Sequence, residues 1–97
     1  METAYYLIVE HPLSDGRTLR TLDDHASAEG AVRDAADYEA GEFAGRWLGA
    51  VELSFDRSGL LIGARAMNDL STRVHEELSR RPAWRRWQRA LQHWSAE

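Results

Sequence analysis

The chain has 97 residues, of which 43% are hydrophobic and 29% are charged, and it contains no cysteine. This length and composition indicate one globular domain, residues 1–97, with a single core. The lack of cysteine excludes disulfides and thiolate metal sites. No apolar run approaches the ~20 residues of a membrane-spanning helix, and the amino terminus lacks the basic flank of a signal peptide. We therefore expect a cytoplasmic protein that does not contact a membrane.

Charge is distributed unevenly along the chain. Every basic residue is an arginine, and the formal net charge is −4. Residues 1–56 contain twelve acidic residues and four arginines, whereas residues 57–97 contain eight arginines and four acidic residues. This polarity predicts one acidic surface and one basic surface, which concerns the binding partners rather than the fold.

The first part of the chain predicts a β-hairpin followed by a helix. Residues 4–10 and 18–22 are rich in β-branched and aromatic side chains and are separated by a glycine-containing turn, so we expect two paired strands. Ser27 is suited to cap a helix over residues 28–40, and Gly41 is suited to end it. Apolar residues of this helix recur at spacings of three and four, at Ala28, Ala31, Val32, Ala35 and Tyr38.

A second hairpin and further helices follow. Residues 46–55 and 60–66 predict two strands around a glycine-containing turn. In the first of them, Val51, Leu53 and Phe55 face one way, whereas Ala50, Glu52 and Ser54 face the other.

Beyond this hairpin, Asn68 or Asp69 caps a predicted helix, and Pro82 begins another. The predicted order is ββ-α-ββ-αα, an α+β fold with a small antiparallel sheet and helices packed on one face.

The sequence offers no recognisable catalytic motif. No two of the four histidines are three to five residues apart, so no helical metal-binding pair is present. A nucleophile elbow, a phosphate-binding loop and a dinucleotide fingerprint are also missing. We therefore predict no catalytic residue, no metal site and no cofactor.

Two segments are candidates for partner binding. Acidic residues on the helix over residues 28–40 could imitate the phosphates of a nucleic acid, or they could simply form a solvated helix face. The first hypothesis assigns partner binding to Glu29, Asp34, Asp37 and Glu39.

The last predicted helix has a second kind of surface. Its apolar side holds Trp84, Trp87, Leu91 and Trp94, which could belong to the core or form the seam of a homodimer. Its arginines could bind nucleic acid or a partner protein. This alternative assigns binding to Arg81, Trp84, Arg85, Arg86 and Arg89.

The segment 36–47 contains Tyr38, Gly41, Gly45 and Trp47. This pattern resembles the Tyr-x-x-Gly-x-x-x-Gly-x-Trp stretch of antirestriction proteins of the ArdA type. The resemblance implies an acidic DNA mimic that is encoded by a mobile element and blocks a restriction enzyme.

The leading hypothesis is therefore a small non-enzymatic inhibitor, encoded by a phage or mobile element. It would bind a bacterial nucleic-acid-processing defence complex, in the manner of anti-CRISPR or antirestriction proteins. The alternative is a nucleic-acid-binding accessory protein that uses the arginine- and tryptophan-rich carboxy-terminal helix.

Overall fold

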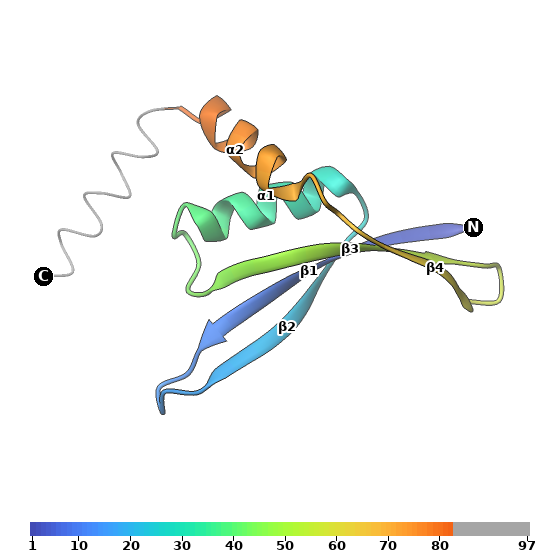
Figure 1. The fold of residues 1–97 in the computed structure, drawn as a ribbon, viewed down its shortest axis with the longest axis horizontal. Coiled ribbons are helices and arrows are strands. Elements are labelled where there is room, and N and C mark those ends of the chain that lie inside the picture. The colour runs from blue at the N-terminus through green and yellow to red at the C-terminus, as the bar shows by residue number, and fades with distance from the viewer. Residues whose placement is uncertain (83–97) are drawn as a thin grey trace, which may run out of the picture.

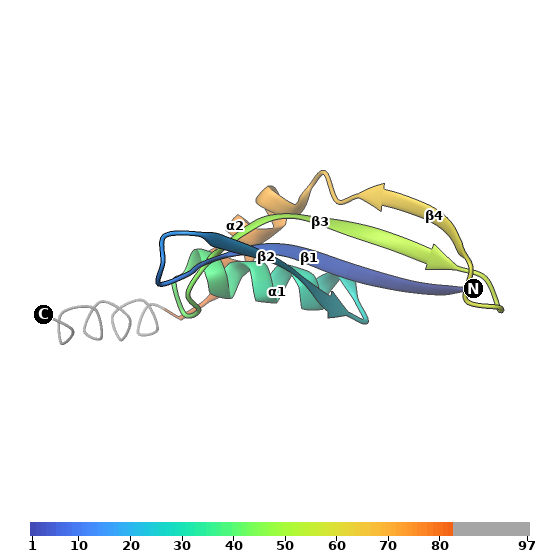
Figure 2. The same ribbon diagram turned by 90° about the horizontal axis from the view of Figure 1, so that it is seen from below.

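The computed structural model describes residues 1–82, which form a four-stranded antiparallel sheet with two helices beside it (Figure 1). The strands follow the order β2-β1-β3-β4. In Figure 2, β4, β3 and β1 lie beside one another, and β2 crosses β1 in this view. The predicted α+β class and the single antiparallel sheet are confirmed, whereas the helix predicted after Pro82 lies outside the described residues. The elements are β1 (Glu2–Pro12), β2 (Thr18–His25), α1 (Ala28–Glu39), β3 (Arg46–Phe55), β4 (Leu61–Ala66) and α2 (Leu70–Arg80).

Strand β2 is longer than the sequence predicts. The prediction ended the strand at Leu22, but Asp23 pairs with Leu7, and His25 pairs with Tyr5. Charged residues are tolerated here because β2 is an edge strand. Two of the three additional residues, Asp23 and His25, also find hydrogen-bond partners on α1.

Helix α1 begins and ends where the sequence predicts. The Ser27 hydroxyl accepts a hydrogen bond from the Gly30 amide at 3.1 Å. At the other end, the Glu42 amide donates to the Asp37 carbonyl, and the Gly41 amide donates to the Tyr38 carbonyl. These two bonds form a Schellman motif, which requires a left-handed residue, and Gly41 supplies it with φ of 77°.

The core lies between one face of the sheet and the two helices. Small side chains on α1 bring its backbone close to the sheet, as the alanine spacing predicts. The buried cluster comprises Leu7, Val9 and Ala50 from the sheet, Val32, Ala35 and Ala36 from α1, and Leu70 and Val74 from α2.

The other face of the sheet is also apolar, and we call it the open sheet face. Directly paired residues in an antiparallel sheet point to the same side, and successive residues alternate. Because Leu7 and Ala50 pair and both face the helices, their neighbours point away from them. The predicted alternation of β3 is confirmed, but the helices cover its less apolar side. The open sheet face contains Ala4, Tyr6, Ile8, Leu22, Val51, Leu53, Phe55 and Leu61.

This arrangement predicts a sharp contrast between two leucine substitutions. Leu7 is fully buried between the sheet and α1, so Leu7→Ala should lower the free energy of unfolding by ~2–5 kcal/mol. Leu60 is 65% exposed in the β3–β4 turn, and Leu60→Ala should change it by less than ~0.5 kcal/mol. Urea denaturation measures both values, and equal losses would contradict the assignment of the core to this face.

Candidate functional site

The four carboxylates predicted to bind a partner do not project from α1 as one row. Each contacts a different part of the fold. Asp34 contacts β2, Asp37 contacts the residue after α2, Glu39 contacts β3, and Glu29 contacts α2.

Asp34 forms the contact with the edge strand. Its Oδ2 lies 3.1 Å from His25 Nε2, and both side chains are about four-fifths buried. Burial raises the pKa of the Asp34 carboxyl above its ordinary value of 3.8, against the opposing effect of His25, and nearby Asp23 raises it further. Asp34 therefore interacts mainly with the interior of the protein.

Asp37 and Arg81 were predicted to belong to two competing binding surfaces, but they contact each other. The Arg81 Nη2 atom lies 2.8 Å from Asp37 Oδ1, and the Arg81 side chain is only 11% exposed. The same nitrogen also lies 3.4 Å from the Arg33 carbonyl oxygen. This pair joins the end of α2 to α1, and removing one partner would leave a largely buried charge.

The remaining two carboxylates are more accessible. The Trp47 indole donates a hydrogen bond of 2.9 Å to Glu39, whose side chain is otherwise exposed. Glu29 lies 3.7 Å from Arg73 and remains 70% exposed. An exposed ion pair of this length contributes little to stability. Of the four predicted carboxylates, Glu29 and Glu39 are thus the ones that a partner can reach.

The other predicted residues fall mostly beyond the described part of the chain. Arg81 is described and is engaged with Asp37. Trp84, Arg85, Arg86 and Arg89 lie outside the described residues, as do the remaining members of the tryptophan stripe.

The positions that resemble antirestriction proteins all have structural contacts. Tyr38 packs edge-on against Phe43, with ring centroids 5.2 Å apart. Gly45 has φ of 118°, and a Cβ atom there would lie 2.7 Å from the Glu10 carbonyl oxygen, so only glycine fits. Gly41 ends the helix, and Trp47 donates a hydrogen bond to Glu39. The four residues that carry the resemblance therefore all shape the connection between α1 and β3.

A polar cluster between β2 and α1 was not predicted. Tyr38 donates a hydrogen bond of 3.4 Å to Asp23, close to the Asp34–His25 pair. Burial raises the pKa of Tyr38, and the neighbouring carboxylates raise it further. His11 lies beside the Tyr38 ring at 6.0 Å and is 2.9 Å from the Thr21 hydroxyl. The sequence signal was Asp23-Asp24-His25, which directly follows the predicted strand over residues 18–22.

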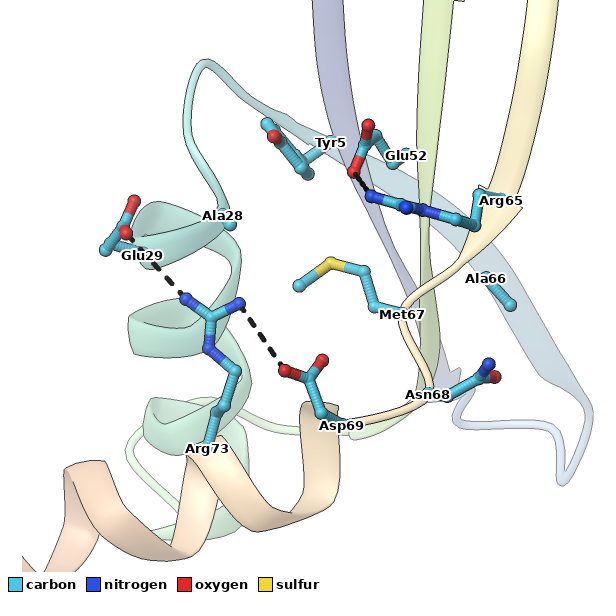
Figure 3. Close-up of a pocket in the computed structure, with 10 residues that line it drawn as sticks. All are labelled: Tyr5, Ala28, Glu29, Glu52, Arg65, Ala66, Met67, Asn68, Asp69 and Arg73. Atoms are coloured by element: carbon cyan, nitrogen blue, oxygen red, sulfur yellow. Dashed lines mark hydrogen bonds and ion pairs between the residues drawn. The ribbon is translucent and has the colours of Figure 1, made fainter.

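A pocket of about 550 Å³ opens where the amino-terminal ends of both helices approach the sheet (Figure 3). Arg73 lies between Glu29 and Asp69, at 3.7 Å and 4.0 Å. On the sheet side, Arg65 donates a hydrogen bond of 2.8 Å to Glu52.

The charges of this pocket favour a basic ligand. Its lining contains three carboxylates and two guanidinium groups, with the Met67 side chain between the two ion-pair networks. The slight excess of negative charge suits a basic side chain better than an anion. Only Glu29 among the lining residues was predicted, although Glu52 and Arg65 carry opposite charges on strands that the sequence predicts to pair.

Within residues 1–82, no group of three or more histidine or acidic side chains is arranged to hold a metal ion. Over the same range, neither helix has the length and apolar character needed to cross a bilayer.

The charge that remains unpaired is mostly negative. Residues 1–82 contain nine arginines and fifteen acidic residues, a net charge of −6 with histidine neutral. Seven of the nine arginines lie within 4.0 Å of a carboxylate, and only Arg33 and Arg57 have no ion pair within this range of residues. The seven acidic residues without an ion pair in the described part of the chain are Glu2, Asp23, Asp24, Glu39, Glu42, Asp56 and Glu76.

Comparison with known proteins yields no relative: no protein-family model, curated protein or solved structure matches this chain.

The position of Asp34 predicts a specific pH dependence. The pKa of the Asp34 carboxyl is raised in the folded state. Its contribution to the free energy of unfolding is therefore fully present below pH 3.8 and is lost as the pH rises through the raised pKa. The Asp34→Asn side chain does not titrate, so this variant should gain stability relative to the wild type as the pH rises through that window. Urea denaturation at a series of pH values measures the difference in free energy of unfolding between the variant and the wild type. A difference that does not change with pH would contradict a raised pKa at Asp34.

Proposed function

We propose that this protein is a non-enzymatic cytoplasmic inhibitor that binds a basic surface of a bacterial nucleic-acid-processing defence complex, as antirestriction and anti-CRISPR proteins do. The excess of unpaired carboxylates over unpaired arginines is the observation that supports it most. Seven of the nine arginines in residues 1–82 lie beside a carboxylate of the same chain, so the charge left unpaired within this range is predominantly negative. The phage or mobile-element origin is part of the same proposal and rests on the resemblance to antirestriction proteins.

Charge of this kind acts mainly on recognition and on the rate of association. An acidic protein is attracted to a basic groove before contact, and the attraction weakens as salt screens it. A groove that binds nucleic acid is necessarily basic, because it must neutralise phosphates. The inhibitor would occupy this groove and exclude the nucleic acid sterically.

The end of α1 is the part of the predicted acidic face that is best placed for this contact. Glu39 is exposed in the last turn of the helix, and Glu42 is exposed in the loop that follows. Neither has an ion pair within residues 1–82. Asp34 and Asp37 are less suitable for a test, because reversing their charge would place a cation against His25 or Arg81.

The test is a double charge reversal, Glu39→Lys with Glu42→Lys. Glu39→Lys removes the exposed hydrogen bond from the Trp47 indole, but a cation in the last turn of a helix interacts favourably with the helix dipole, so the fold should be preserved. In cells that carry a restriction or CRISPR system, the wild type should raise the plating efficiency of a targeted phage. We expect the double variant to lose at least ~10-fold of this protection, since close charge pairs at interfaces contribute more than ~1.4 kcal/mol.

The matched control is Glu2→Lys with Glu76→Lys, which changes the net charge equally at two exposed sites elsewhere. Equal loss in both variants would show that only the total charge matters. Full protection by Glu39→Lys with Glu42→Lys would contradict binding through the end of α1. Absence of protection by the wild type across a panel of defence systems would contradict the proposed function itself.

A further inference from the structure

The open sheet face is an apolar surface that neither helix of the described structure covers. Leu22 is 64% exposed and Leu61 is 50% exposed on this face, although both lie within strands. A monomeric soluble protein rarely exposes a contiguous apolar patch of more than a few hundred Å². This sheet has apolar residues on both faces, but the helices cover only one of them.

The margin of the face is nearly neutral, in contrast to the rest of the domain. At one end, Glu10 lies between two cations, at 3.5 Å from Arg20 and 3.1 Å from Arg46. The unpaired carboxylates at its margin are Glu2 and Asp24, so the face as a whole has a net charge of −1. Residues 1–82 have a net charge of −6, which opposes contact between two copies through most other surfaces. Two copies can meet through this face with little repulsion.

The size of the face suits a stable interface. The four strands contain thirty-five residues. At roughly 3.3 Å along a strand and roughly 4.8 Å between strands, they give a flat outline of roughly 550 Å². This outline is roughly two-thirds of the ~800 Å² that each partner buries in a standard interface, and the side chains that project from it add to the area.

The alternation of large and small side chains on the face also permits two sheets to pack with their side chains interdigitated. Gly49 pairs with Ile8, and a Cβ atom at Gly49 would meet nothing within 4 Å. Ala64 pairs with Leu53, so a small residue again lies beside a large one. Packed sheets lie ~10 Å apart with interdigitated side chains, which requires this alternation of projections and recesses.

We propose that the open sheet face is the contact surface between two copies of this chain, related by a twofold axis. The dimer is a four-layer arrangement in which two sheets pack together and the helices lie outside. A twofold interface places the same patch on both partners, so a near-neutral, self-complementary apolar face meets its requirement. A basic partner attracted by the acidic surface would find no matching charge here, and this surface is therefore separate from the end of α1.

The experiment is sedimentation equilibrium of the full chain over a range of micromolar concentrations. The wild type should approach twice its 11.0 kDa mass. Leu22→Arg places an unpaired charge in the proposed interface and should weaken self-association by at least ~100-fold. Leu19→Arg is the matched control, because Leu19 is on the same strand, is 51% exposed and pairs with His11 on the opposite face. It should leave the dimer unchanged.

Three outcomes would overturn the proposal. The first is a folded monomer at every concentration, which would leave the face to another occupant such as the carboxy-terminal tryptophan segment. The second is an unchanged dimer in Leu22→Arg that is lost in Trp87→Glu with Leu91→Glu, since the seam would then lie in that segment. The third is equal weakening by Leu22→Arg and Leu19→Arg. If circular dichroism shows that Leu22→Arg is unfolded, Leu61→Arg serves as the second variant on the face.

Discussion

The close contact between α1 and the centre of the sheet is the interaction on which the rest of the structure depends. Ala31, Ala35 and Ala36 are fully buried, and their small side chains allow the helix backbone to approach the sheet. Residues 1–82 contain six other buried hydrophobic residues, and α2 packs mainly against α1. The position of α1 on the sheet therefore determines the position of α2, and with it that of Arg81.

This dependence explains how the carboxylates of α1 are used. In so small a domain, polar contacts at the rim of the core help to orient a helix whose buried side chains are mostly alanine. Asp34 and Asp37 have this role, whereas Glu39 remains accessible at the end of the helix. The acidic character of the domain thus combines ion pairs within the chain with unpaired surface charge, and a partner can reach the unpaired charge without breaking an ion pair.

Local signals in the sequence predicted most of the fold. The Ser27 cap, the Gly41 helix end and the alternation of β3 each depend on a few adjacent residues, so periodicity and turn chemistry reveal them. The sequence could not show which side of β3 the helices cover, because that choice depends on contacts between distant segments. The partners of Asp34 and Asp37 were hidden for the same reason, since His25 and Arg81 reach them only through the tertiary fold.

Strand β4 has a consequence for solution behaviour. It is an edge strand that begins within the exposed apolar run Leu60, Leu61 and Ile62, and such edges can add strands from other chains. Its short length and the register shift between Ser54 and Phe55 limit this growth. Loss of the β3–β4 pairing would release this apolar run and break the Arg65–Glu52 ion pair, so partial unfolding at this edge is the step from which we expect aggregation to start.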